Sequence, residues 1–375
     1  MTEAVPIFEP DSQETSPVHR EKELLDLQKE NFEEHEQWHV KLQEVVSAIK
    51  KKSGALKEVT AAMRQKNDDD GSLEAQNIHL LLIVLGGAMQ GPYGAGQISA
   101  LQEMGYTDRH LDGRDVFLGI STGAPTCAFG MAGKKQALLG TSYYYTVCTT
   151  PSFINYLRLH PIVDVGFIEK ILREGPMKLD VGAVLKNPAQ LYVQARNENK
   201  QVPEFINAKN PGVDMIDAIH ASMAIPMVYD QKIMIDHTAY TDGSFEDPLP
   251  ITRAIEQFKP THVLILPNIP FNRIPVEDPS KIKKMLLEAI PENSSLGFIR
   301  KVLEHRQMLR HALDAIAERH DVKIGIAWPP EMGLYPLVQD PKKIRDAIRA
   351  SAKEMFVLFG ENDRSLKLYE EEYGQ

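Results

Sequence analysis

Gly119 and Gly123 flank Ser121 in the pentapeptide G-I-S-T-G, which follows the apolar residues 116–118. Hydrolases place a nucleophilic serine at such a turn from a buried strand into a helix, because glycines leave room for the neighbouring backbone. The helix that follows directs free N–H groups and its positive dipole end toward an oxyanion beside the serine. The pattern predicts a nucleophile at Ser121; a serine that only caps the helix is the alternative.

A glycine-rich turn lies upstream of this pentapeptide, after the apolar residues 79–85. At the carboxyl end of a buried strand, such a turn exposes backbone amides that suit a phosphate or an oxyanion. A P-loop would end in G-K-[ST], and a dinucleotide site would contain G-x-G-x-x-G; the turn contains neither pattern. The sequence therefore argues against nucleotide binding.

Asp242 and Gly243 follow the short strand-like run 232–236, and the small residues of A-S-M-A-I-P at 221–226 precede that run. An aspartate before a glycine is commonly only a hairpin turn. However, the glycine-rich turn, G-x-S-x-G, A-S-x-A-x-P and D-G occur in an order that resembles the patatin-like phospholipases, a family of lipid acyl hydrolases. The resemblance extends over about residues 78–268, and Asp247-Pro248 makes the chain similar to the bacterial branch of the family.

The resemblance implies a serine acyl hydrolase that cleaves (phospho)lipid esters through a Ser-Asp dyad, with no cofactor. Ser121 would be the nucleophile and Asp242, supported by Gly243, the general base. Because an aspartate in water has a pKa near ~4, it must be partly desolvated to accept a proton near neutral pH. The resemblance also implies an oxyanion hole built from the backbone N–H groups of Gly86, Gly87, Ala88, Met89, Gln90 and Gly91.

Two residues of the glycine-rich turn depart from the family pattern. The family usually has G-G-G-x-R-G, whereas Ala88 stands at the third glycine and Gln90 at the arginine. A methyl group suits this position only if φ of Ala88 is negative, and a neutral amide does not replace a guanidinium. Two alternatives therefore stay open: a catalytically weak lipid-binding or scaffolding protein of the same fold, and a soluble esterase for small esters.

Several other side chains suggest chemistry but have plainer interpretations. A histidine could complete a Ser-His-Asp triad, which we consider less favoured than the dyad; the candidates are His220, His237 and His262. Four methionines are expected to fill the core, with an acyl-chain pocket as the alternative: Met215, Met223, Met227 and Met234. Residues 143–145 (Y-Y-Y) are expected on a cap or helix surface, with lipid contact as the alternative. Cys127 and Cys148 are expected to be buried and reduced, and no metal-binding motif is present.

The composition agrees with a lipid or ester substrate. A hydrophobic share of 43% in 375 residues supports a large core, and the net charge of −10 argues against nucleic-acid binding. Local lysine clusters leave peripheral membrane contact open. No apolar run reaches the ~18 residues that span a bilayer. The first residues lack the layout of a secretory signal, and two cysteines suit a reducing compartment, so we expect a cytoplasmic protein.

Three parts are expected along the chain. Residues 1–19 form a polar, disordered tail. Residues 20–72 form a charged coiled-coil-like helix, with an apolar stripe that includes Val59 and Met63, and a linker. We slightly favour a role in self-association, as a homo-oligomer, or in docking over a single amphipathic helix laid on the catalytic domain. Residues 73–375 form the acyl hydrolase domain with a C-terminal extension, including helices over 298–320 and after Asp340.

Alternation of strand-like and helical stretches predicts an α/β fold with a largely parallel sheet, and the resemblance implies three α/β/α layers. The strand-like runs are 80–85, 116–118, 191–195, 233–235, 262–266 and 323–327.

Overall fold

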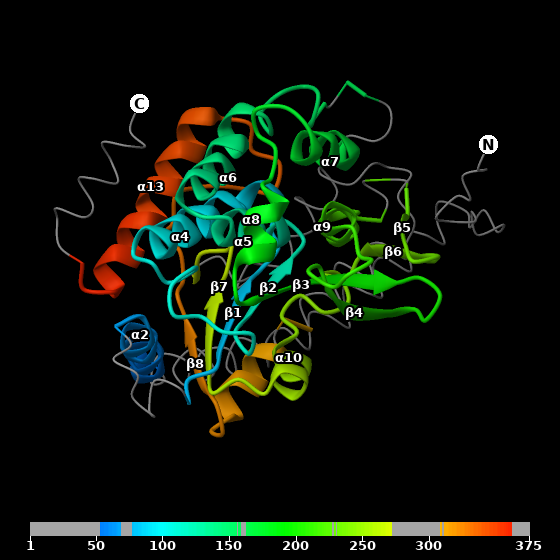
Figure 1. Ribbon diagram of the computed structural model, residues 1–375. Coiled ribbons are helices and arrows are strands. Elements are labelled where there is room, and N and C mark those ends of the chain that lie inside the picture. The colour runs from blue at the N-terminus through cyan, green and yellow to red at the C-terminus, as the bar shows by residue number, and fades with distance from the viewer. Residues whose placement is uncertain are drawn as a thin grey trace, which may run out of the picture.

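The computed structural model describes residues 53–68, 77–155, 157–158, 163–226, 229, 231–271, 308–309 and 311–361. Within these residues an eight-stranded sheet has the order β5-β6-β3-β2-β1-β7-β8, with β4 paired to β3 (Figure 1). The strands are β1 (Leu80–Val84), β2 (Val116–Ile120), β3 (Gln190–Asn197), β4 (Val202–Asn207), β5 (Ile233–Ile235), β6 (Thr238–Asp242), β7 (His262–Leu266) and β8 (Lys323–Ile326).

The sheet is parallel from β3 through β2, β1 and β7 to β8, and antiparallel where β4, β5 and β6 join β3. The predicted α/β fold and the six strand-like runs are confirmed. β4 and β6 were not predicted, because their side chains are mostly half-buried and form no continuous apolar run.

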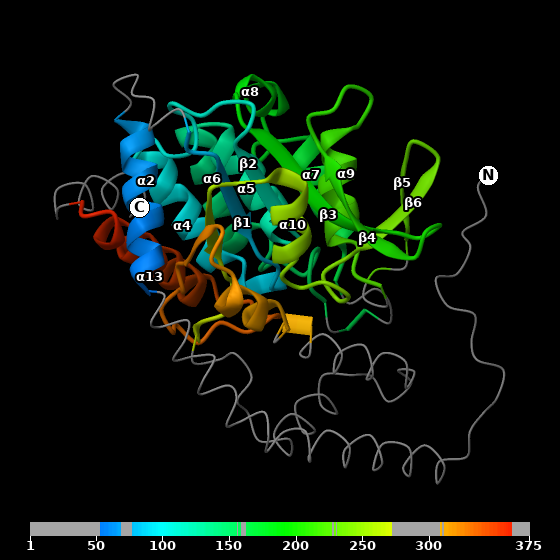
Figure 2. The same cartoon turned by 90° about the horizontal axis from the view of Figure 1, so that it is seen from below.

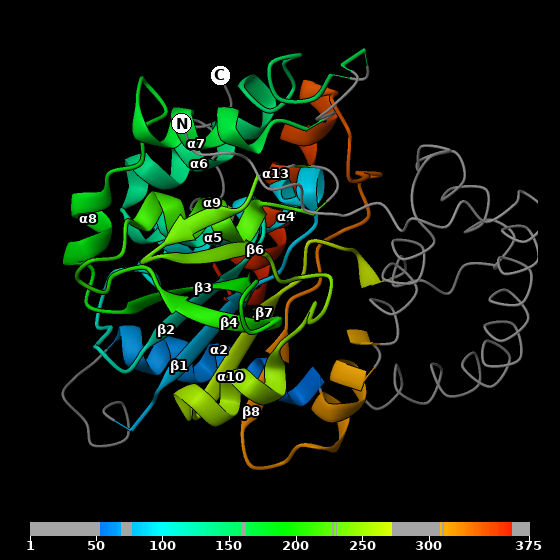
Figure 3. The ribbon, with the colours of Figure 1, turned by 90° about the vertical axis from the view of Figure 1, so that its right-hand side faces the viewer.

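Strand β1 shows how the layers form, because its side chains alternate between two cores. Leu82 and Val84 join a core with α4 (Pro92–Glu103), α5 (Gly123–Met131), α6 (Lys134–Thr146) and α13 (Pro341–Leu358). Leu81 and Ile83 join a second core with α10 (Ile251–Phe258) and the helical residues 311–318. Figure 3 shows the two sets of helices on opposite sides of the sheet.

The predicted C-terminal helix is α13. The carboxylate of Asp340 accepts hydrogen bonds from the backbone N–H groups of Lys342 and Lys343, and Pro341 follows at the first helical position. Ile344, Ile348 and Met355 face the core as their spacing predicts, and α13 packs on α4. The shorter helix α9 (Met215–Met223) packs on β3 and β6. Helix α7 (Val165–Arg173) packs on α9, and α8 (Val181–Lys186) contacts α5.

Helix α2 (Ser53–Asn67) corresponds to the end of the expected coiled-coil-like segment, and it packs on β7 and β8 beside α13 (Figure 2). Val59 and Met63 are buried in the domain core, so these stripe residues are not available to a second copy. The buried Lys66 ammonium contacts the Asp115 carboxylate at 2.8 Å and donates to the carbonyl of Ile78. For this stretch the structure corrects the preference for self-association in favour of a helix laid on the catalytic domain.

Other expectations lie outside the described residues. These include the tail 1–19, residues 20–52 of the charged segment, and residues 298–307 of the expected long helix. In the described portion of the chain, no helix is both long and apolar enough to cross a bilayer.

Candidate active site

Ser121 lies between the end of β2 and the start of α5, in a conformation that few residues with a side chain adopt. Its φ is 51°, in the left-handed region. A Cβ atom at Gly119 would lie 2.4 Å from the Cα of Ala124, and one at Gly123 would lie 2.1 Å from the carbonyl oxygen of Val84. The flanking glycines therefore allow α5 to pack tightly against the strands, as the pattern predicts.

Asp242 ends β6, and the pairing of β3 explains why it lies next to the serine. Ile120 pairs with Gln194, and Asp242 pairs with Ala195, the next residue of β3. β4 pairs with the opposite edge of β3, including Ala195. β2 and β6 therefore lie end to end along the same edge of β3. The residue after Ile120, which is Ser121, must therefore meet Asp242.

The carboxylate of Asp242 is 2% exposed and only partly satisfied. Its Oδ1 accepts a hydrogen bond from the backbone N–H of Ser244 at 2.7 Å, while Oδ2 has no hydrogen-bond partner among the described residues. Burial raises the pKa of Asp242 to about 6, against the opposing influence of the Ser244 N–H and the Ser121 hydroxyl. The Ser121 hydroxyl is thus close to the carboxylate, although no hydrogen bond of ordinary geometry joins them.

The glycine-rich turn reaches the serine at Gly86, where a Cβ atom would lie 3.1 Å from the Cβ of Ser121 and 3.8 Å from its Oγ. The turn continues into a 3-10 helix over Ala88–Gln90. The N–H groups of Gln90 and Gly91 donate to the carbonyls of Gly87 and Ala88 within that helix. They are therefore not available to an oxyanion.

The N–H of Met89 is also occupied, because it donates to the carbonyl of Pro336 at 3.0 Å. Among the six residues expected to form the oxyanion hole, the structure removes Met89, Gln90 and Gly91 as donors. Gly86, Gly87 and Ala88 remain. The condition set for Ala88 is not met, since its φ is 49° rather than negative.

Gln90, which replaces the arginine of the family, is buried under the segment 328–340. Its side-chain amide donates to the carbonyl of Leu334 at 3.3 Å. The hydroxyl of Tyr93, one turn further along the chain, accepts from the N–H of Met332 at 3.1 Å. The glutamine therefore belongs to a set of contacts that hold this segment on the turn.

Two side chains that the sequence did not single out stabilise the two glycine motifs. The amide of Asn268, after β7, donates to the carbonyl of Leu85 and accepts from the N–H of Gly94, so it spans the glycine-rich turn. The hydroxyl of Tyr144 lies 2.6 Å from Oγ1 of Thr122, directly after the serine. No pattern in a single sequence indicates these long-range partners.

Comparison with known proteins agrees with this arrangement. Residues 82–255 match the model of the patatin-like phospholipase family. The matched segment extends from β1 to α10 and includes Ser121 and Asp242. The resemblance drawn from the four motifs is thereby confirmed.

The chain is also similar to individual proteins. It is 23% identical over 263 residues to the uncharacterized protein YjjU of Escherichia coli strain K12; the alignment covers 67% of this chain and 69% of YjjU. The crystal structure of VipD from Legionella pneumophila is similar with a TM-score of 0.41 and 14% identity, covering 75% of this chain and 67% of that one.

None of the three histidines considered for a triad forms a hydrogen bond with Ser121 or Asp242 in the described parts of the chain. His237 is exposed in the turn between β5 and β6, with φ of 60°. His220 is buried on α9 against Tyr229, and burial lowers its pKa to about 4. His262 begins β7, at the opposite end of the parallel strands from the serine, and contacts Thr261.

The expectations for the tyrosines and methionines need correction in part. Tyr143 and Tyr144 are buried in the core rather than on a surface. Met215 and Met223 are buried as core filler, but Met234 is 57% exposed. Met227 lies outside the described residues, so the four do not form one cluster in the described structure. Cys127 and Cys148 are buried free thiols, as expected.

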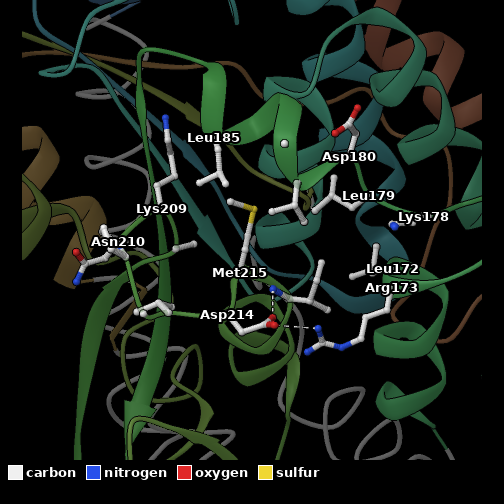
Figure 4. Close-up of a pocket in the computed structure, with 17 residues that line it drawn as sticks. Leu172, Arg173, Lys178, Leu179, Asp180, Leu185, Lys209, Asn210, Asp214 and Met215 are labelled. Carbon is white, nitrogen blue, oxygen red and sulfur yellow. Dashed lines mark hydrogen bonds and ion pairs between the residues drawn. The ribbon is translucent and has the colours of Figure 1, made fainter.

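A cavity of about 960 Å³ lies between α7, α8 and the start of α9 (Figure 4). Leu172, Leu179 and Met215 line it, and Arg173 pairs with Asp214 at its border. None of its lining residues belongs to the candidate dyad or the glycine-rich turn. Ser222, which contacts Ser121, lies near the other end of α9, so the cavity is separate from the candidate active site. No group of three or more potential metal ligands occurs among the described side chains.

Proposed function

We propose that this protein is a serine acyl hydrolase that cleaves lipid esters, with Ser121 as nucleophile and Asp242 as general base. The family supports lipid acyl hydrolysis in general. The observation that carries the proposal is the pairing of Ile120 and Asp242 with successive residues of β3, which brings the serine at the strongly bent turn next to a buried carboxylate.

The chemistry proceeds in two steps. With a pKa of about 6, Asp242 is ionised at neutral pH yet basic enough to accept the Ser121 proton as Oγ attacks the ester carbonyl carbon. The alcohol leaves with that proton, and the acyl group stays on Ser121. Water then attacks the acyl-enzyme while Asp242 accepts its proton, and the fatty acid and free serine are released.

The negative charge of each tetrahedral intermediate needs donors that are not otherwise used. The N–H groups of Gly86, Gly87 and Ala88 make no backbone hydrogen bond within the described parts of the chain, and Gly86 adjoins the serine. The start of α5 lies directly after Ser121 and adds a positive dipole end. Together they offer an oxyanion hole that needs no guanidinium at position 90.

The main competing function is a scaffolding protein that keeps the fold without turnover. Gln90 was its principal support, but its buried contact with Leu334 gives the glutamine a structural place in the turn. The unpartnered Oδ2 of Asp242 favours the enzyme, because a buried polar atom without a partner is costly and persists where function requires it.

A fluorophosphonate probe tests the proposal. We expect mass spectrometry of the digested protein to place the label on Ser121, and we expect Ser121→Ala to abolish labelling and hydrolysis of lipid esters. Ser142→Ala, on the surface side of α6, is the matched control and should behave like wild type. A folded wild-type protein that takes no label would contradict the enzyme and support the scaffold.

A further inference from the structure

Gln194 is a buried polar side chain in the middle of the sheet, beside both halves of the candidate dyad. It is 0% exposed, between the buried residues Val193 and Ala195 of β3. Gln194 itself pairs with Ile120, and Ala195 pairs with Asp242. A buried amide in a central strand requires full hydrogen bonding to be tolerated, so its partners show what it does.

Both donors of the Gln194 amide bind the turn that follows Asp242. Nε2 donates to the carbonyl of Gly243 at 3.2 Å and to the carbonyl of Asp247 at 2.7 Å. The N–H groups of Glu246 and Asp247 also donate to the Gly243 carbonyl, which closes the turn. One amide group therefore holds both ends of the 243–247 turn against β3.

Arg253, on α10, completes the contact and fixes the orientation of the amide. Its Nη2 donates to Oε1 of Gln194 at 3.0 Å, and its Nε donates to Oδ2 of Asp247 at 2.8 Å. Its Nη1 donates to the carbonyl of Pro203 at 2.7 Å, and the guanidinium lies 4.4 Å from the ring centre of Phe205. The acceptor and both donors of Gln194 are thereby used.

We propose that Gln194, held by Arg253, is a positioning residue that keeps the Asp242 carboxylate in place for proton transfer with Ser121. This inference rests on the proposed function and assigns a further residue to the same site. Gln194 contacts no reacting atom. It acts through the turn, because Oδ1 of Asp242 accepts its hydrogen bond from Ser244 inside that turn.

The charged side chains near the turn form ion pairs with one another, and in the described structure none of these pairs includes Asp242. Asp247 pairs with Arg253, and Glu246 pairs with Arg196 at 2.6 Å. Across β6, Glu198 contacts Arg196 and Lys232 and accepts from the hydroxyl of Thr241. The Arg196–Glu246 pair is a second, partly exposed link between β3 and the turn, whereas the Gln194 amide is fully buried and contacts the carbonyls at both ends of the turn.

Replacing Gln194 with methionine tests the proposal, because methionine has a similar length and no hydrogen-bonding amide. Carbon-13 NMR of the aspartate carboxyl groups gives the pKa of Asp242, with its signal assigned by Asp242→Asn. We expect Gln194→Met to lower this pKa from about 6 by roughly one unit or more, since a loosened turn lets water reach the carboxylate. We also expect kcat to fall about tenfold, with KM changed less than about twofold, because the loss affects proton transfer rather than substrate binding.

Gln190→Met on the same strand is the matched control, because Gln190 contacts Asn207 rather than the turn. It should leave the pKa of Asp242 and kcat unchanged. If Gln194→Met does not fold, Arg253→Lys, on the half-exposed α10, gives the same measurement. A folded variant in which Asp242 titrates as in wild type would overturn the positioning role. A shifted pKa in a protein with no turnover would keep that role and contradict the hydrolase.

Discussion

The hydroxyl of Ser222 accepts a hydrogen bond from the backbone N–H of Ser121 at 2.9 Å. Two residues later, the carbonyl of Ala224 accepts the backbone N–H of Asp242, also at 2.9 Å. One short segment at the C-terminal end of α9 therefore holds the backbone at both candidate catalytic positions. This gives the A-S-x-A-x-P pattern a physical role: small residues allow α9 to approach, and the serine within it fixes the strained elbow.

We predict that Asp242→Asn reduces ester hydrolysis by two orders of magnitude or more, because an amide cannot accept the serine proton. His237→Ala should retain nearly full activity, since this side chain is exposed in the β5–β6 turn. Steady-state kinetics of both variants on one lipid ester decides between dyad and triad. An inactive His237→Ala beside an active Asp242→Asn would indicate a histidine base.

The pH dependence of activity follows from the raised pKa of Asp242. The base must be ionised, so kcat/KM should fall as the pH drops through about 6 and be almost lost near pH 4. Initial rates between pH 4 and 9 in buffers of constant ionic strength measure this limb. A limb centred near pH 4 would mean that the carboxylate is hydrated, contrary to the structure.

The stability of the protein should depend on pH in the opposite direction to its activity. A carboxyl group whose pKa is raised on folding binds more protons in the native state, so wild type loses stability as the pH rises from about 4 to about 6. The loss amounts to about 3 kcal/mol above pH 6. Asp242→Asn lacks this penalty and should be more stable than wild type at pH 8 but equally stable near pH 4. Urea unfolding at both pH values measures the difference; equal stability at pH 8 would contradict it.

Ala88→Gly should stabilise the protein or leave it unchanged. The left-handed φ of Ala88 costs a residue with a side chain about 1 kcal/mol, which offsets the greater chain entropy that glycine loses on folding. The control is Ala61→Gly, exposed within α2, which should cost about 1 kcal/mol. The changes in melting temperature caused by the two substitutions should have opposite signs or clearly different sizes. Equal losses would show that position 88 is unstrained.

Lys66→Met should destabilise the protein by about 3 to 5 kcal/mol, because it leaves the buried Asp115 carboxylate without its cation. Lys57→Met, exposed on the same helix, should have little effect. Chemical unfolding of both variants gives the two free energies. A small loss for Lys66→Met would mean that α2 is not held to the sheet by this ion pair.

The sequence was sufficient for six of the eight described strands, and it indicated Ser121 and Asp242 because each belongs to a short motif that follows a strand-like run. It was not sufficient for the oxyanion donors. Whether the N–H of Met89 is available depends on the carbonyl of Pro336, and no local pattern reports a contact across such a distance in sequence. The positive φ of Ala88 is likewise not indicated by the local sequence.

The sequence also did not predict correctly which side chains are buried. The tyrosines at 143–145 carry hydroxyl groups and follow polar residues, which favours a helix surface. However, the hydroxyl of Tyr144 is hydrogen-bonded to Thr122, and its side chain lies in the core. Gln194 was overlooked in an apolar strand, although a single polar residue in such a run can indicate a buried network. The stripe of α2 was visible, but periodicity alone does not distinguish docking on the same chain from docking on another copy.

The family match ends at residue 255, but the sheet does not. β1 lies between β2 and β7, and both β7 and β8 come from beyond that residue, as do the carbonyls that hold Met89 and Gln90. A fragment cut at 255 would present the open edge of an apolar strand to other chains, which invites aggregation. The segment that matches the family model is therefore shorter than the segment that builds the sheet.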